Sequence, residues 1–164
     1  MQKGLCVYPG SFDPITCGHL DLIERATQIF PRVLVTVLGN PSKRNFFSKE
    51  KRQCMLQKVC SHLPTVETDT FDGLLVDYMA KVNAGVVLRG LRAVTDFESE
   101  FMMAQVNHQI SLKVETLFLM TAPQYAYISS SVVREVGSLG GDISSFIPAC
   151  ILEEVSAGLQ HLRT

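Results

Sequence analysis

The sequence lacks the features that would place the chain in a membrane, on a nucleic acid or in an oxidising compartment. No apolar stretch reaches membrane-spanning length, and the N-terminal apolar run, interrupted by Pro9, is too short for a signal peptide. No run of Lys and Arg exceeds two residues and the formal net charge is -1, so no broad basic surface is expected. The five cysteines are an odd number without a C-x-x-C pair, which argues against a zinc site or a disulfide framework. We therefore expect a cytoplasmic protein with no membrane and no nucleic-acid partner.

Several common site motifs are also absent. The glycines form neither G-x-x-x-x-G-K-[ST] nor G-x-G-x-x-G, so a P-loop and a dinucleotide-binding loop are excluded. No G-x-S-x-G nucleophile elbow occurs. The chain has 164 residues, of which 46% are hydrophobic and 19% charged, enough for a sizeable buried core. With no repeat or linker in sight, we expect one domain over residues 1–164.

Short apolar or β-branched runs alternate with stretches of helical periodicity. The predicted strands cover residues 5–8, 33–38, 65–68, 86–88 and 116–120. The predicted helices begin near Gly18, Ser48, Asp72, Asp96, Ser130 and Pro148. This alternation predicts an α/β fold, a Rossmann-like, doubly wound parallel sheet of five strands with helices on both faces. Ligands of such sheets bind beyond the carboxyl ends of the strands, where the strand order reverses.

The loop after the first predicted strand, residues 10–19, has the residues of an anion site. Gly18 allows a ligand to approach the start of the following helix, whose free N–H groups suit a phosphate. His19 lies in the first helical turn and can donate a hydrogen bond to a phosphate oxygen. A solvated histidine at a helix start is the equally weighted alternative.

Three further loops carry phosphate-compatible donors at predicted strand ends or helix starts. They are residues 40–44 with Lys43, residues 89–92 with two arginines, and residues 125–131 with three serines, which lead into a helix with Arg134. Solvated basic side chains and a serine helix cap explain each loop taken alone. Because all four loops are predicted at one edge of the sheet, together they indicate a nucleotide or phosphate site.

Three motifs resemble those of a known family. Residues 16–19, T-C-G-H, are similar to the T-x-G-H signature of the nucleotidyltransferase superfamily, and residues 128–134, I-S-S-S-V-V-R, to its I-S-S-[ST]-x-x-[RK] signature. Residues 89–98, R-G-L-R-A-V-T-D-F-E, resemble the R-G-[LI]-R-x-x-x-D-[FY]-E segment of the bacterial phosphopantetheine adenylyltransferases. The resemblance spans nearly the whole chain.

The resemblance implies transfer of AMP from ATP to 4′-phosphopantetheine, giving 3′-dephospho-coenzyme A and pyrophosphate, the penultimate step of coenzyme A synthesis. It implies Mg2+ with the ATP, no metal-binding residue, and a homohexamer. It makes His19 the stabiliser of the transition state. The implied ATP-binding residues are Ser11, Phe12, His19, Gly90, Leu91, Arg92, Glu100, Tyr125, Ala126, Tyr127, Ile128, Ser129, Ser130 and Ser131. The implied acceptor-binding residues are Ser11, Lys43, Leu75 and Arg89.

Two other functions stay open on the residues alone. One is the same chemistry on another acceptor, such as nicotinamide mononucleotide or glycerol phosphate, and the other is a module that binds a nucleotide without turnover. The helix after Asp96 is apolar around much of its circumference, which favours a homo-oligomer. An ordinary histidine titrates near pH 6.5, so we expect protonated His19 to assist phosphate binding and to shape the pH profile.

Overall fold

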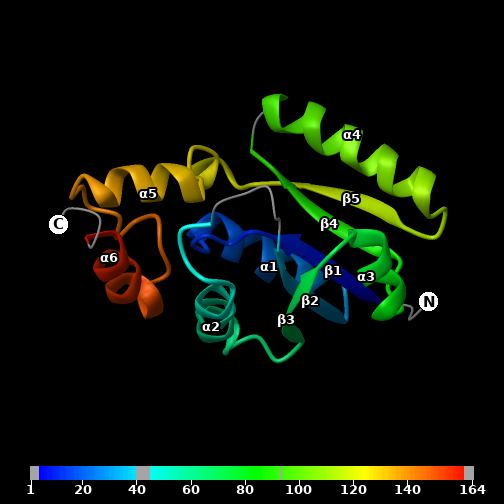
Figure 1. Cartoon of the computed structure of the whole chain (residues 1–164), viewed down its shortest axis with the longest axis horizontal. Coiled ribbons are helices and arrows are strands. Elements are labelled where there is room, and N and C mark those ends of the chain that lie inside the picture. Colours follow the sequence, from blue (N-terminus) through cyan, green and yellow to red (C-terminus); the bar gives the residue numbers. More distant parts are fainter. Residues whose placement is uncertain (1–3, 40–44, 93, 161–164) are drawn as a thin grey trace.

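The structure is a computed structural model that describes residues 4–39, 45–92 and 94–160, with the main chain alone at residues 94–96. Strands and helices alternate along the chain (Figure 1). The strands are β1 (Leu5–Gly10), β2 (Arg32–Gly39), β3 (Val66–Asp72), β4 (Val86–Leu91) and β5 (Glu115–Met120). The α-helices are α1 (Cys17–Ile29), α2 (Lys49–Cys60), α3 (Leu75–Lys81), α4 (Val94–Ile110), α5 (Ser130–Ser138) and α6 (Leu152–Gln160). Two short 3-10 helices, η1 (Pro123–Tyr125) and η2 (Ala149–Ile151), precede α5 and α6.

The five strands form one parallel sheet in the order β3-β2-β1-β4-β5. The Rossmann-like α/β fold predicted from the alternation is confirmed. The chain moves outward from β1 to β3 and then returns to the other side of β1 with β4. The strand order therefore reverses between β1 and β4, where a ligand-binding crevice is expected.

Side chains of β1 alternate between two hydrophobic clusters, one on each face of the sheet. Cys6 and Tyr8 belong to the larger cluster, which also takes buried side chains from α1, α2, α5 and α6. Leu5 and Val7 belong to the smaller cluster, which includes the buried face of α3. Helix α4 contacts α3, β4 and β5 and forms an outer layer beside them (Figure 1). A strand buried on both faces needs an apolar run rather than alternation, as residues 5–8 have.

Several element boundaries differ from the sequence-based prediction, and two of them concern the site. β4 continues to Leu91 because its pairing with β5 extends through Arg89, Gly90 and Leu91, so these residues lie in a strand and not in a loop. The predicted helix start at Asp72 is wrong, because pairing with Gly39 keeps Asp72 in β3. Gly73 then turns the chain with φ of +129°, and α3 begins at Leu75.

Within the described residues, no helix combines the length and the apolar composition that crossing a bilayer requires.

Candidate active site

A cleft of about 980 Å³ opens beyond the carboxyl ends of β1 and β4, where the strand order reverses. Its walls come from the loop after β1, the start of α1, β4 with α4, and the start of α5. Three of the four loops predicted to bind phosphate contribute to one cavity. The fourth, residues 40–44 with Lys43, lies outside the described residues. The size of the cleft suits a nucleotide and an acceptor together.

The loop after β1 turns sharply around a buried aromatic ring. Phe12 has a positive φ of 46° and only 1% exposure, and its ring packs edge-on against the rings of Tyr8 and His19, at 5.4 and 5.2 Å between centroids. A Cβ at Gly10 would lie 2.8 Å from this ring, so residue 10 must be glycine for the turn to close. Phe12 therefore offers its main chain to the cleft, whereas Ser11 is exposed beside it.

The first turn of α1 fixes both the position and the tautomer of His19. Thr16 is the N-cap, and its Oγ1 accepts a hydrogen bond from the His19 N–H at 3.4 Å. In return, His19 Nδ1 accepts from the Thr16 N–H at 3.0 Å, which completes a capping box with histidine in the usual place of Glu or Gln. A main-chain N–H can only donate, so Nδ1 carries no proton and a neutral ring carries its proton on Nε2. His19 is thereby prepared to donate from Nε2 into the cleft that it lines.

The charge state of His19 differs from the expectation for an ordinary histidine. Burial, and next the positive charge of Arg92, lower the pKa of His19 from 6.5 to about 4. The prediction that a protonated His19 shapes the pH profile near pH 6.5 is therefore wrong for the unliganded protein. A neutral imidazole still serves as a hydrogen-bond donor, so the predicted contact with phosphate does not depend on protonation.

Two residues predicted to bind different ligands are paired in the cleft. Arg89 on β4 donates to both carboxylate oxygens of Glu100 on α4, at 2.5 and 2.7 Å, and to the Pro9 carbonyl at 3.0 Å. These bonds use three of its five N–H donors, so as far as the described residues go two remain for a ligand. Arg92 lies beside the opposite wall, with Nη1 3.4 Å from the Ile128 carbonyl.

The three serines at the start of α5 have different partners. Ser129 is the N-cap, with Oγ accepting from the Val132 N–H at 3.1 Å, and it also lies 3.0 Å from Ser131 Oγ. Ser130 donates from Oγ to the Pro14 carbonyl at 2.7 Å. The helix cap considered as the simpler alternative is thus present at Ser129. All three residues also line the cleft, so the positive end of α5 lies at its wall.

The sequence was compared with families and proteins already known. Residues 7–136 match the Cytidylyltransferase-like family. The chain is 52% identical to a phosphopantetheine adenylyltransferase of Syntrophotalea carbinolica, over 92% of this chain and 91% of that protein. It is 48% identical to one of Clostridium perfringens, over 96% of both chains. The chain belongs to the phosphopantetheine adenylyltransferase family. It is therefore a nucleotidyltransferase.

A solved structure from Vibrio parahaemolyticus, described as a proposed nicotinate-nucleotide adenylyltransferase, has the same fold. Its TM-score is 0.67, and the match covers 92% of this chain and 97% of that one. The sequences are only 17% identical, so this likeness speaks for the fold and not for the acceptor.

Most residues implied by the resemblance meet in the cleft. Those lining it are Ser11, Phe12, His19, Leu75, Arg89, Gly90, Arg92, Glu100, Ile128, Ser129, Ser130 and Ser131. Leu91, Tyr125, Ala126 and Tyr127 lie outside its lining. Successive side chains of a strand point to opposite faces, so Leu91 is buried where its neighbour Gly90 lines the cleft. The contacts of these four residues with ATP stay predictions.

The structure adds lining residues that the motifs did not indicate. Ser99, Met103 and Asn107 follow one another at a spacing of four on α4 and, with Glu100 and Ala104, give this helix a stripe facing the cleft. The spacing was visible in the sequence. Nothing in the sequence showed that this stripe, rather than the phenylalanines beside it, faces a ligand.

Proposed function

We propose that the enzyme transfers AMP from ATP to 4′-phosphopantetheine and releases pyrophosphate and 3′-dephospho-coenzyme A, the penultimate step of coenzyme A biosynthesis. The proposal is supported by relatives of this name at about half identity. The observation that carries it is the cleft itself. Donors from four separate elements, the Nε2 of His19 among them, line one cavity at the switch point of the sheet.

The chemistry requires alignment of two anions more than proton transfer. An oxygen of the acceptor phosphate attacks the α-phosphorus of ATP, the bond to the β-phosphate oxygen breaks, and its electron pair leaves with pyrophosphate. A phosphate monoester has a second pKa of about 6, so the attacking dianion exists at neutral pH without a protein base. The enzyme has to hold the reactants in line and to stabilise the charge that builds up on the transferred group.

The residues of the cleft divide between the two substrates. Nε2 of His19 donates to the transferred phosphate, beside the start of α5 and Arg92, which bind the phosphates of ATP. Ser11, at the exposed end of the loop after β1, serves both substrates. Arg89, oriented by Glu100 and Pro9, uses its two remaining N–H donors on the acceptor phosphate, and Leu75 packs against the acceptor chain.

Magnesium is held chiefly by the substrate in this proposal. Within the described residues no three His, Cys, Asp or Glu side chains form a metal-binding group. The two carboxylates of the cleft are engaged, Asp13 with main-chain N–H groups and Glu100 with Arg89. This donor set fits a largely hydrated Mg2+ bound through phosphate oxygens, where it neutralises charge on the leaving pyrophosphate.

Pyrophosphate release tests the acceptor directly. The enzyme is incubated with Mg2+ and ATP, and with 4′-phosphopantetheine, nicotinamide mononucleotide, nicotinate mononucleotide or glycerol phosphate. Of these four acceptors, we expect only 4′-phosphopantetheine to be turned over. Faster turnover with a mononucleotide would overturn the acceptor, and saturable ATP binding without turnover on any acceptor would identify a binding module. Arg89→Lys should raise the KM of the acceptor, and Arg92→Lys that of ATP, because lysine cannot reproduce a guanidinium fork.

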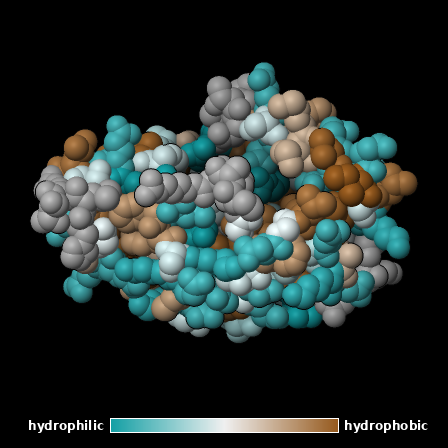
Figure 2. Space-filling view, in the orientation of Figure 1, coloured by the Kyte–Doolittle hydropathy of each residue, from teal (hydrophilic) through white to brown (hydrophobic). Residues whose placement is uncertain are grey.

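We also propose a homo-oligomer, a hexamer, in the cytoplasm. Large apolar side chains on α4 and β5 are exposed, namely Phe97, Phe101, Met102, Met103, Val106, Ile110, Leu117 and Met120. Figure 2 shows hydrophobic residues gathered over the α4 side of the molecule. A monomer rarely exposes so large an apolar patch, so a second copy is the expected cover. Five free cysteines are consistent with a reducing compartment.

A further inference from the structure

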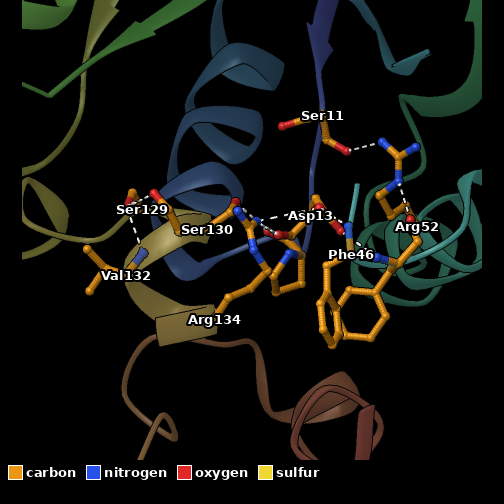
Figure 3. A network of polar contacts seen from close by, with 11 residues as sticks. Ser11, Asp13, Phe46, Arg52, Ser129, Ser130, Val132 and Arg134 are labelled. Atoms are coloured by element: carbon orange, nitrogen blue, oxygen red, sulfur yellow. Dashed lines mark hydrogen bonds and ion pairs between the residues drawn. The ribbon is translucent and has the colours of Figure 1, made fainter. Parts of the chain in front are cut away.

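The segment after β1, residues 11–14, is held by side chains that come from distant helices. Arg52 on α2 donates from Nη1 to the Ser11 carbonyl at 2.6 Å, and Arg134 on α5 donates to the Asp13 carbonyl. Ser130 donates to the Pro14 carbonyl at 2.7 Å. Figure 3 shows Arg52 and Arg134 approaching this segment from opposite sides. Three of the four carbonyls of the segment are thus fixed by side chains, so its path depends on tertiary contacts.

The buried carboxylate of Asp13 ties the same segment to Phe46 and Phe47. Asp13 is 3% exposed, and its two oxygens accept from the main-chain N–H groups of Phe46 and Phe47 at 2.7 and 2.8 Å. Nη1 of Arg134 lies 3.5 Å from Asp13 Oδ2. These donors compensate for the cost of burying the charge, and they leave Asp13 a single orientation.

Arg52 on α2 holds the same two segments together through their main-chain carbonyls. It is 2% exposed, and its guanidinium binds the Phe47 carbonyl through Nε at 3.1 Å and the Ser11 carbonyl through Nη1. No carboxylate of the described residues lies within ion-pair distance of it. Burial of a guanidinium between two carbonyls is costly and fixes those carbonyls relative to one another. Arg52 does not line the cleft, although it borders a second pocket that shares Gly39 and Asn45 with it. Because the side chain is only 2% exposed, we expect it to act on substrates through the residues that it holds.

The position of this segment determines where two site residues lie. Ser11 is its first residue, and the ring of Phe12, its second, packs against His19. The segment then leads through Ile15 into the Thr16 cap that orients the His19 ring. A displacement of the segment would therefore move both Ser11 and His19 relative to the phosphates.

We propose that Arg52 is a positioning residue for the reaction. Through the carbonyls of Ser11 and Phe47 it holds residues 11–14 so that Ser11 and Nε2 of His19 meet the transferred phosphate. The inference rests on the proposed adenylyl transfer, and it concerns a residue that no motif of the sequence marks.

Arg52→Lys tests the inference against a matched control. Lysine keeps the charge but has one nitrogen in place of the fork, and displacement of reacting groups by about 1 Å costs about 10²-fold in rate. We expect kcat to fall about 10²-fold with little change in the KM of ATP. Val59→Ala, on the same helix and 2% exposed, removes packing without touching the segment and should keep kcat at a similar loss of Tm. Unchanged kcat in Arg52→Lys, or an equal fall in both variants, would overturn the inference.

Two further measurements test the inference if Arg52→Lys fails to fold, or if the enzyme does not catalyse the proposed adenylyl transfer. Arg134 holds the same segment through the Asp13 carbonyl and also lines the cleft, and with a side chain 32% exposed it is expected to tolerate Arg134→Lys. That variant should lower kcat and leave the KM of ATP unchanged, whereas an unchanged kcat would show that the hold on the segment does not matter and would overturn the inference. NMR of the His19 ring needs no turnover. Its Nε2 resonance should shift in Arg52→Lys and not in Val59→Ala, and an unshifted resonance would refute the positioning role even if another reaction replaced the proposed one.

Discussion

Replacement of His19 separates its two hydrogen bonds. Nδ1 accepts from the Thr16 N–H inside the capping box, while Nε2 donates into the cleft. Glutamine at this position can still accept from Thr16, because Gln is an ordinary third residue of a capping box. His19→Gln therefore keeps the hydrogen bond to Thr16 and replaces the imidazole N–H with an amide N–H of different geometry, whereas His19→Ala removes both side-chain hydrogen bonds.

The expected magnitudes follow from these two roles. Loss of one donor to the transition state costs about 10²–10³ in kcat, which we expect for His19→Ala; His19→Gln should lose less, because its amide N–H replaces the imidazole donor in part. Loss of the hydrogen bond from the Thr16 N–H costs about 0.5–1.5 kcal/mol of unfolding free energy, which we expect for His19→Ala and not for His19→Gln. The bond from the His19 main-chain N–H to Thr16 stays in both variants. The KM of ATP should change less than kcat in both, because the donor acts mainly on the transition state.

Steady-state pyrophosphate release and urea unfolding measure the two effects independently. Thr16→Ala tests the cap. It removes the hydroxyl, which accepts from the His19 N–H and also lies 2.9 Å from Nδ1, while the Thr16 N–H that donates to Nδ1 remains. It should lose about 0.5–2 kcal/mol of unfolding free energy and retain more of its kcat than His19→Ala. If His19→Ala turned over at the wild-type rate, or if kcat tracked stability across the three variants, the role assigned to Nε2 would be refuted.

Four further predictions concern pH, packing and assembly. Because the pKa of His19 is about 4 when folded and ordinarily 6.5, the unfolded chain binds a proton first as the pH falls, so stability is lost between pH 6.5 and 4. The loss is at most about 3 kcal/mol and should be absent in His19→Gln when unfolding is followed across that range; an identical pH dependence would contradict the lowered pKa. Above pH 6, kcat/KM for the acceptor should level off with no alkaline fall from His19. Because kcat/KM reports the free enzyme, a fall that His19→Gln abolished would contradict the lowered pKa of His19. A Cβ at Gly90 would lie 2.3 Å from Leu22 Cδ1, so Gly90→Ala should cost about 1–3 kcal/mol of unfolding free energy. In a chain that already carries Leu22→Ala the clash is gone, so Gly90→Ala should cost less there; the same cost in both backgrounds would exclude the clash. Met102→Glu, at a side chain 62% exposed, should lower the mass found by light scattering, and an unchanged oligomer would remove α4 from the interface.

Much of the fold was determined locally. Residues 5–8 and 33–38 are apolar runs too short for helices, and Gly18 and Ser48 stand where helices begin, so the alternation of strands and helices was predictable. The capping residues Thr16 and Ser48 act within four residues of themselves. Such features depend on neighbouring residues, and neighbours are visible in a sequence.

The strand and helix limits that failed depended on pairing. Nothing near Arg89 distinguishes a loop from a strand, because its strand conformation comes from β5, which begins more than twenty residues later. The end of β3 likewise depends on Gly39 of β2. Hydrogen bonds between strands decide where a strand stops, and a local pattern does not contain them.

The sequence by itself determined the class of fold, the loops that carry phosphate-compatible donors and the family to which the chain belongs. Only the tertiary structure decided how those donors are used. It paired Arg89 with Glu100, buried Arg52 against Ser11 and Phe47, and placed Arg134 on Asp13, 121 positions away. It also lowered the pKa of His19, because burial and a neighbouring charge are properties of the folded chain. Residue types restrict which contacts are possible, and the packing of distant elements selects among them.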